Sequence, residues 1–418
     1  MMLFKSVISL VLAASSLVWA DNDTKTKTAK LKDTTTSINP CSQRTTLREA
    51  TAIQQLIACE TLAGEIIITG NEVVALDLSQ VEEITGDVSI RNSPSIISLN
   101  LNRLETISGS LVLNNNTQLT SIDLTSLTDA DNLQFISLPA FSTLNLNQGV
   151  RTAGRVVLSD TALENLNGLA AFDTIDYMNI NNNKNMINVA FSNLETVKDS
   201  LIISFNNDDA IVNLDSLKWA SNLTVQDVAE LSAQNLTAVN GSLQISYNGF
   251  ESVNLTKLTN VGSSLQIFAN DALTSLDLHL LEEIGGELSM FNNTELEDAQ
   301  DSFESLERVR GAVSISGNLV NFSMPSLNRV NGDFELRSTS EDLDCSEFDE
   351  LHDEGNIEGH NYVCSHAEQL ETSTAQATSD ATTGSSDTSP DKESAGAILF
   401  VPTIFAAGIV AGAFFAIM

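Results

Sequence analysis

The chain has 418 residues, with 20 Lys and Arg against 55 Asp and Glu, which gives a formal net charge of −35. This length is enough for a large core. The acidic balance excludes nucleic acid as a partner, because phosphates require a basic surface, whereas an acidic surface suits solubility in an extracellular setting.

The first residues have the pattern of a processing signal. Residues 1–20 place Lys5 before an apolar run that ends in Val18-Trp19-Ala20, which predicts a secretory signal peptide cleaved after Ala20. Residues 21–39 are polar, rich in Lys and Thr and without periodicity, so a disordered lead is expected there.

Residues 41–63 are predicted to form an N-terminal cap. Apolar residues with helical spacing occur in this segment, at Leu47, Ala50, Ile53, Leu56 and Ile57. Cys41 and Cys59 flank them. A cap is required because the end of a repeat array exposes apolar core and unpaired strand edges.

Residues 64–344 form a repeat array with a period of about 22 residues. Each repeat starts at a glycine, or at an Asp or Ser in its place, and the residues two and four places further on are apolar. The starts are Gly64, Gly86, Gly109, Asp131, Gly154, Asp176, Asp199, Ser221, Gly241, Ser263, Gly286, Gly311 and Gly332. Such short alternation predicts a strand with one face turned inward, preceded by a tight glycine turn.

An asparagine recurs seven places after the start of many repeats. It is found at Asn71, Asn116, Asn183, Asn206, Asn248, Asn270, Asn293 and Asn318. Because Asn tolerates left-handed backbone and its amide bonds to nearby backbone in turns, these residues are expected to form a hydrogen-bonded ladder between coils. A polar ligand strip is the alternative.

A second alternating run follows the asparagine, as in LTSIDLTSL (119–127) and LTSLDLHLL (273–281). Its spacing is similar to that of leucine-rich repeats, so a horseshoe of such repeats is the alternative fold. Because a strand-like run occupies the side that a helix would take, an all-β parallel solenoid of about 13 coils is favoured. Residues 126–149 lack the glycine and the asparagine, and are either a seam between two modules or a degenerate coil.

The four cysteines lie in two local pairs at opposite ends of the array. In a secreted protein an even number of cysteines predicts disulfides, and the positions favour Cys41–Cys59 and Cys345–Cys364 among three pairings. The second pair would close a C-terminal cap at 345–366. A zinc site is the alternative for this cap, but the spacing of its ligands matches no standard zinc finger; they would be Cys345, His352, His360, Cys364 and His366.

The C-terminal segments resemble those of a lipid-anchored surface protein. Residues 367–394 are rich in Ser and Thr, which predicts an O-glycosylated stalk, and residues 395–418 are uncharged. Small residues at 394–396 precede this tail, as attachment of a GPI anchor requires, and favour Ser394 over a site at 384–386. A single-span tail anchor is disfavoured because no basic flank follows the tail.

Together these features resemble the fungal extracellular-mutant family of GPI-anchored cell-wall-organisation proteins from ascomycete yeasts, which has sporulation-specific paralogues. The most specific stretches are VVLSDTALENLNG (156–168), MNINNNKNM (178–186) and LDSLKWASNLTVQDV (214–228). The coil is also similar to the receptor L domains, which are short right-handed β-helices. The resemblance implies a glycoprotein of the outer leaflet of the plasma membrane and of the cell wall, needed for wall organisation and integrity. It implies no reaction, no catalytic residue, no metal and no cofactor.

N-glycosylation sequons predict which residues lie on the surface. They occur at Asn22, Asn115, Asn222, Asn235, Asn240, Asn254, Asn292 and Asn321. Because residues 64–220 contain only Asn115, this barer half is expected to present the surface that contacts glucan or protein.

Two other functions are alternatives to a structural one. A wall-polysaccharide-remodelling enzyme would need converging carboxylates, and the candidates are Asp160, Asp176, Asp208, Asp209 and Asp215. They fall at different positions in the coil, so the chain is not expected to be an enzyme. A receptor-like ligand-binding module is suggested only by the L-domain resemblance. Trp219 is a candidate sugar platform, although a core position is favoured. Cell-wall glucan or wall glycoproteins are the expected partners, besides the plasma membrane reached through the GPI anchor.

Overall fold

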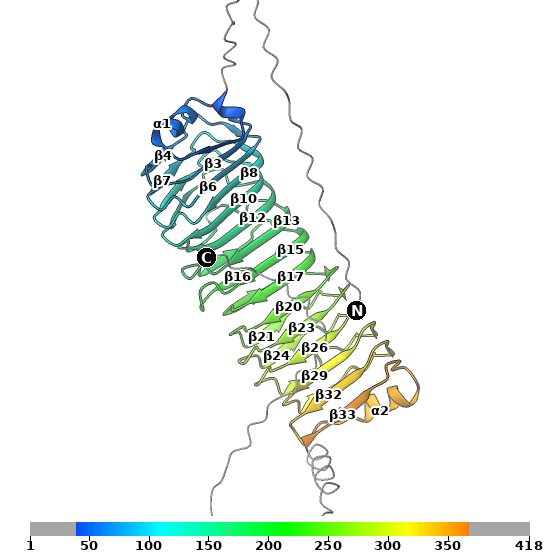
Figure 1. The fold of residues 1–418 in the computed structure, drawn as a ribbon. Coiled ribbons are helices and arrows are strands. Elements are labelled where there is room, and N and C mark those ends of the chain that lie inside the picture. The colour runs from blue at the N-terminus through cyan, green and yellow to red at the C-terminus, as the bar shows by residue number, and fades with distance from the viewer. Residues whose placement is uncertain (1–38, 167, 368–418) are drawn as a thin grey trace, which may run out of the picture.

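A computed structural model describes residues 39–166 and 168–367 of the chain. They wind into a parallel β-solenoid of about 13 turns, whose strands stack along one long axis (Figure 1). This confirms the predicted solenoid over the leucine-rich-repeat horseshoe, because most coils contain a second short strand and no helix. The predicted signal peptide, lead, stalk and tail, with Asn22 and Ser394, lie outside the described residues apart from a few boundary positions.

The first sheet runs the whole length of the solenoid. Its strands are β1 (Thr45–Leu47), β2 (Thr61–Leu62), β3 (Glu65–Ile68), β5 (Glu83–Ile84), β6 (Asp87–Arg91), β8 (Thr106–Asn114), β10 (Asp129–Leu138), β12 (Thr152–Thr161), β13 (Thr174–Asn181), β15 (Thr196–Ser204), β17 (Trp219–Gln226), β19 (Ala238–Val239), β20 (Leu243–Ser246), β22 (Asn260–Val261), β23 (Leu265–Phe268), β25 (Glu283–Ile284), β26 (Leu288–Phe291), β28 (Arg308–Val309), β29 (Val313–Gly317), β31 (Arg329–Val330), β32 (Phe334–Ser338) and β33 (Tyr362–Ser365). Residues 126–149 continue the solenoid without a break, since their strand β10 pairs with both β8 and β12 in this sheet.

The second side of the solenoid carries shorter strands in four separate groups. They are β4 (Ala75–Asp77), β7 (Ser98–Asn100), β9 (Ser121–Asp123) and β11 (Thr143–Asn145), then β14 (Asn188–Ala190), β16 (Ile211–Asn213) and β18 (Glu230–Ser232), then β21 (Ser252–Asn254) with β24 (Ser275–Asp277), and β27 (Asp298–Ala299) with β30 (Asn321–Phe322). The core lies between the two sides. None of the helices within the described ranges is long and apolar enough to cross a membrane.

The alternating sequence pattern places every second side chain of a strand in the core. In β20, Leu243 and Ile245 are at most 1% exposed, while Gln244 between them is partly exposed. Burying one such aliphatic side chain stabilises the fold by about 1.5–3 kcal/mol. Because each coil repeats this burial, one continuous apolar core extends from the first coil to the last.

The glycines at the coil starts are required by the close approach of neighbouring coils. A Cβ atom added to Gly109 would lie 2.1 Å from the carbonyl oxygen of Gly86, one coil earlier. Neither glycine has a positive φ. The predicted glycine position is therefore correct, but its physical reason is backbone packing between coils and not the turn itself.

Left-handed backbone recurs near the end of the main strand in ten coils, and at Gly70 in the first coil. The residues other than glycine with positive φ, between 50° and 60°, are Asn92, Asn115, Ser137, Asp160, Asn182, Phe205, Asp227, Tyr247, Ala269 and Asn292. The recurring asparagines themselves are not left-handed, since the left-handed residue comes one place earlier. It turns the following side chain into the molecule.

The recurring asparagines form the expected ladder where they are buried. The Oδ1 atom of Asn270 accepts hydrogen bonds from the backbone N–H and the Nδ2 atom of Asn248, at 3.1 and 2.9 Å, and its Nδ2 atom donates to the carbonyl of Ile245 at 3.1 Å. Asn293 repeats the pattern on Asn270. Asn71, at the first coil, is instead exposed.

The N-terminal cap combines a strand with a short helix. It begins with η1 (Pro40–Ser42), and after β1 the helix α1 (Ala50–Ile53) continues into η2 (Gln54–Leu56). The disulfide Cys41–Cys59 joins η1 to the end of the cap. Leu47, which was predicted on a helical face, pairs with Ile68 as part of β1. This segment forms a strand and not a helix because the open edge of β3 offers hydrogen-bond partners to its backbone.

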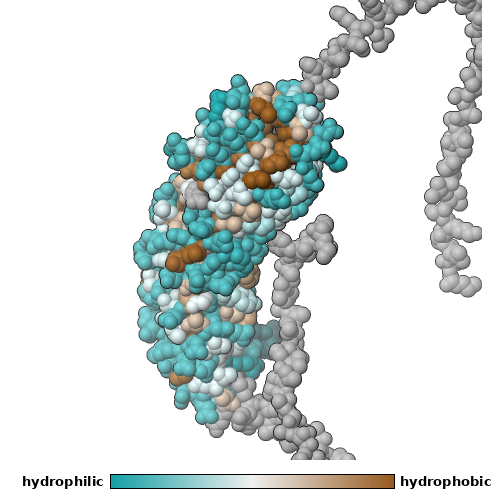
Figure 2. Space-filling model, turned by 90° about the vertical axis from the view of Figure 1, so that its left-hand side faces the viewer, coloured by the Kyte–Doolittle hydropathy of each residue, from teal (hydrophilic) through white to brown (hydrophobic). Residues whose placement is uncertain are grey.

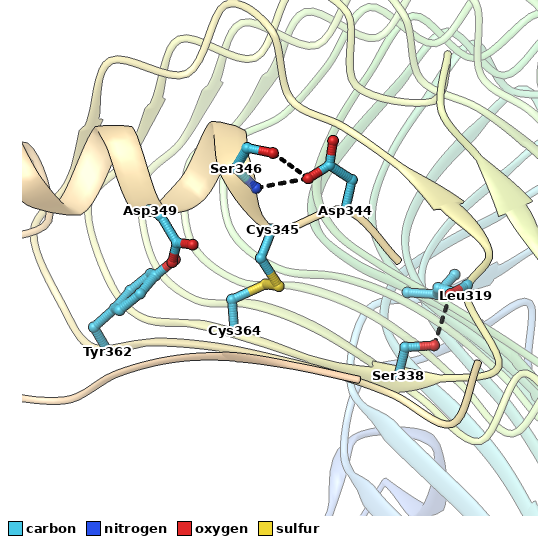
Figure 3. Close-up of a disulfide and its surroundings, with 8 residues drawn as sticks. All are labelled: Leu319, Ser338, Asp344, Cys345, Ser346, Asp349, Tyr362 and Cys364. Atoms are coloured by element: carbon cyan, nitrogen blue, oxygen red, sulfur yellow. Dashed lines mark hydrogen bonds between the residues drawn. A yellow bond between two sulfur atoms is a disulfide. The ribbon is translucent and has the colours of Figure 1, made fainter. Parts of the chain in front are cut away.

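The C-terminal cap covers the other end with a helix, α2 (Ser346–Asp353), and the last strand, β33. The disulfide Cys345–Cys364 joins them (Figure 3), as the local pairing predicted, so these two sulfur atoms are not free thiolate ligands for zinc. The Oδ1 atom of Asp344 accepts hydrogen bonds from the backbone N–H and the hydroxyl of Ser346 at the start of α2. Burial is the main cause that raises the pKa of the Tyr362 phenol, and the hydrogen bond that its hydroxyl donates to Asp349, at 2.7 Å, raises this pKa further.

Candidate functional site

The outward side chains of the first sheet form three columns, which we call the neutral face. The middle column is uncharged from the first coil almost to the last, and paired strands place these residues in register. It consists of Ile67, Ser89, Val112, Gln134, Val157, Asn179, Ile202, Thr224, Gln244, Gln266, Ser289 and Ser314. Uncharged side chains over so many coils are unexpected on a chain with a net charge of −35.

The two flanking columns extend the same character. The outer column, beside the left-handed corner, consists of Asn114, Ile136, Ser159, Asn181, Ser204, Gln226, Ser246, Phe268 and Phe291. The inner column, beside the glycine corner, consists of Ser110, Asn132, Arg155, Tyr177, Ser200 and Asn222. Among these residues Arg155 alone is charged, and its guanidinium lies 3.8 Å from the centroid of the Tyr177 ring. Toward the ends of the solenoid the same register adds charged residues: Glu65 and Asp87 to the inner column, and Arg91 and Arg337 to the outer column.

Hydrogen bonds between neighbouring side chains hold the amides of this face in place. Asn181 accepts a hydrogen bond from the hydroxyl of Ser159 at 2.6 Å and donates to the Oδ1 atom of Asn179 at 2.7 Å. Gln226 and Gln244 both donate to the hydroxyl oxygen of Ser246, at 2.9 and 3.1 Å. The face is therefore a flat, ordered surface of amides and hydroxyls that can donate and accept hydrogen bonds without net charge.

Three aromatic rings stand at the outer edge of the neutral face on consecutive coils. Phe268 and Phe291 are stacked, with ring centroids 4.8 Å apart and planes 8° from parallel. Tyr247 meets Phe268 edge-on, at 5.5 Å and 81°. Tyr247 is 55% exposed and Phe291 is 37% exposed. The stack was not predicted from the sequence, although the spacing of about one repeat between the three residues could have revealed it.

A groove of about 560 Å³ runs along the glycine corner of the central coils. Its lining includes Asp129, Asp176 and Lys198, and Lys198 pairs with Asp176 at 2.9 Å. Hydrogen bonds from Thr152 and then Thr128 lower the pKa of Asp129. Asp129 and Asp176 are therefore already bonded to neighbouring side chains.

The carboxylates considered for catalysis are not brought together. Asp160 lies at a left-handed corner, Asp176 lies in the corner groove, and Asp209 lies in the turn after the ladder. Asp208 precedes Asp209 in that turn. Asp215 accepts hydrogen bonds from Ser232 and Gln234 beyond β16. Within the described part of the chain, no group of three or more His, Cys, Asp or Glu residues has the arrangement of a metal site.

Trp219 is not a core residue, contrary to the favoured interpretation. It begins β17 and is half-buried, while Ala220 beside it is fully buried and takes the inward place.

On the second side of the solenoid, hydrophobic residues gather toward the N-terminal end (Figure 2). The exposed Val74 and Ile97 belong to those coils. This aliphatic patch is local, whereas the neutral face spans most of the solenoid.

The sequons differ in which side of the coil they occupy, and not only in which half of the solenoid contains them. Asn115 and Asn292 lie at left-handed corners, Asn240 lies at the glycine corner, and Asn254 and Asn321 lie on second-side strands; all five are exposed. Asn235 is half-buried in the turn that leads back to the first sheet. Among the described sequons, only Asn222 lies on the neutral face.

We expect Asn222 to carry no glycan in the folded, secreted protein. Its Nδ2 atom, where the sugar would attach, donates to the carbonyl of Asp199 at 2.9 Å, and its Oδ1 atom accepts from the N–H of Ser242 at 3.0 Å. A chain modified there loses contacts between coils. Mass spectrometry of glycopeptides is expected to find Asn222 unmodified and the exposed Asn240 modified. A glycan at Asn222 in folded protein would contradict this arrangement.

These features define a disulfide-closed, parallel β-solenoid of an oxidising, extracellular setting, with a broad sheet face whose middle column is uncharged. The chain is 53% identical over 331 residues to the cell surface GPI-anchored protein ECM33 of Candida albicans, covering 79% of this chain and 80% of that protein. It is 32% identical over 306 residues to the cell wall mannoprotein PST1 of Saccharomyces cerevisiae, covering 73% and 68%. It is 32% identical over 291 residues to sporulation-specific protein 2 of the same yeast, covering 69% and 57%.

The chain belongs to this family of fungal GPI-anchored cell-wall proteins, which includes sporulation-specific members. The resemblance seen in the sequence is thereby confirmed, as is the location at the cell surface and wall. No family model and no solved structure matches the chain.

Proposed function

We propose that this protein organises the fungal cell wall by non-catalytic binding, and that the neutral face is its contact surface. Its relatives ECM33 and PST1 are named as a cell-surface and a cell-wall protein and not as enzymes. The observation that carries the proposal is the middle column, which contains no charged residue from Ile67 to Ser314 on an otherwise acidic chain.

Charge is removed from a surface at a cost in solubility, which a binding role explains. The cores of binding interfaces are depleted of charged residues, because a charge buried under a partner must be desolvated. Amides and hydroxyls instead exchange water for partner hydrogen bonds at little cost. The face therefore fits a neutral wall component better than an acidic one.

A remodelling enzyme finds less support among the described residues. Hydrolysis of a glycosidic bond requires two carboxyl groups about 5–10 Å apart on one surface. The candidate carboxylates lie at different positions around the coil, and Asp176 and Asp215 are bonded to other side chains.

The proposal is tested by placing positive charge on the neutral face. The double variant Thr224→Lys with Gln266→Lys is expected to fail to restore survival in a wall-perturbing dye to cells that lack this protein. The matched control, Thr143→Lys with Ser275→Lys, adds the same charge to exposed positions on the second side and is expected to restore survival.

Surface amount, measured by antibody binding, and melting temperature are compared for the two double variants. Full rescue by the face variant at equal surface amount and equal stability would overturn the proposal.

A further inference from the structure

We propose that the outer edge of the neutral face holds one sugar ring of a β-linked glucan between Phe291 and Arg337. This inference rests on the proposed function, because it names the ligand of the same face. It starts from the point where the aromatic stack ends.

The stack leaves one ring face without a neighbour. Tyr247 covers one side of Phe268, and Phe291 covers the other. The far side of Phe291 is turned toward the next coil, where β29 pairs in register with β26 as far as Met290 and Ile315. The residue that follows in the outer column is therefore Ser316, which is small and exposed.

The coil after that restores a large side chain. Ser316 pairs with Arg337 in β32, and Arg337 forms an ion pair with Glu335. The outer column thus reads Phe291, Ser316, Arg337, with a one-coil gap between a ring and a planar guanidinium. Strands lie about 4.8 Å apart, so these groups are separated by roughly 9–10 Å along the axis.

This gap is wide enough for one saccharide ring. A flat group packed between two others at carbon contact distances of about 3.5–4.0 Å needs about 7–8 Å. Ser316 would form the floor, and Arg337 with Glu335 would supply donors and acceptors to neighbouring hydroxyl groups. The charge of the pair is internally balanced, which agrees with a neutral ligand.

The chemistry favours a β-linked glucose polymer. In β-glucopyranose every substituent is equatorial, so both faces of the ring present only axial C–H groups. These apolar faces pack on the negative π-face of an aromatic ring. A mannose ring carries an axial hydroxyl, which disturbs one face. The hydroxyl groups on the edge of glucose are left free for the amides of the neutral face.

The test uses the purified full chain and a soluble β-1,3-glucan oligosaccharide, with mannan as the comparison ligand, measured by calorimetry. We expect binding to the glucan and at least tenfold weaker binding to mannan. Phe291→Ala, which removes the wall of the gap, and Ser316→Phe, which fills it by extending the ring stack, are each expected to weaken glucan binding at least tenfold. The control is Phe205→Ala, which removes a 43% exposed ring from a left-handed corner away from the gap.

Melting temperature separates folding from binding, and Ser316→Phe is expected to leave it unchanged or higher. Undiminished glucan binding by Ser316→Phe, or equal binding of mannan, overturns the inference. The glycan at Asn292, next to Phe291, is the competing occupant. Glucan binding that emerges only in Asn292→Gln would assign the gap to that glycan and also overturn the inference.

The outcomes also separate this inference from the proposed function. If Phe291→Ala and Ser316→Phe bind glucan normally while the lysine variant of the neutral face fails in cells, this site falls and the binding role of the face stands.

Discussion

Replacing Asn270 by leucine is expected to lower the free energy of unfolding by about 2–5 kcal/mol. Leucine has a similar volume but accepts no hydrogen bond, so the backbone N–H and the Nδ2 atom of Asn248 lose their acceptor. Asn270 is fully buried, and each buried donor left without a partner costs about 1–3 kcal/mol. Denaturant unfolding monitored by circular dichroism measures the difference.

The matched control for this change is Asn71→Leu. Asn71 occupies the same position in the first coil but is exposed, so its replacement is expected to alter stability by no more than about 0.5 kcal/mol. Equal losses at the two positions would show that the residue type matters for the turn and not for the ladder.

Removing the C-terminal disulfide with Cys345→Ser and Cys364→Ser is expected to cost about 3 kcal/mol. The bridge closes a loop with a sequence separation of 19, and loops of this size lose about that much entropy in the unfolded chain when crosslinked. The cap that this disulfide closes also covers the aromatic end of the core, where the ring centroids of Phe348 and Phe334 lie 5.1 Å apart.

The loss is expected to be local, because coils in a solenoid contact only their neighbours. Hydrogen exchange should rise in β29, β32 and β33 and stay unchanged in β3 and β6. The double variant Cys41→Ser and Cys59→Ser, which opens a loop with a separation of 18, serves as the comparison and should give the reverse pattern. Uniform acceleration along the chain in either variant would contradict a nearest-neighbour solenoid.

The repeat pattern predicted the core because burial and sequence share one period. Leu243 and Ile245 point inward, as the alternating pattern predicts. Leu133 and Phe135 are also buried, although their coil lacks the starting glycine. A strand has only two faces and alternate residues share one of them, so the face that carries the apolar residues is the buried one.

The left-handed corner could not be located in this way. Its residues include Asn, Asp and Ser but also Phe205 and Tyr247, which have no intrinsic preference for positive φ. The repeated coil geometry imposes that conformation on whichever residue ends the strand. The Asn residues that the sequence singled out serve instead as side-chain bridges between coils.

The candidate site escaped prediction because it depends on neighbours that are far apart in sequence. Phe268 and Phe291 are adjacent only after the coils stack, and the missing charge of the neutral face becomes visible only when residues one period apart are aligned. Trp219 shows the converse difficulty. Its neighbour Ala220 is small enough to enter the core, and a rule based on hydrophobic size alone assigns the inward place to the larger ring.

The asparagine ladder also gives the solenoid a direction of assembly. Each ladder amide reaches back to the preceding coil, as Asn270 does to Ile245 and Asn248 and as Asn293 does to Ile267 and Asn270. A coil that has just been laid down therefore keeps an unpaired buried N–H until the next one closes over it. A chain that folds from its N-terminus always has one unfinished coil at its growing end, and that end moves toward the C-terminal cap as each new coil is added.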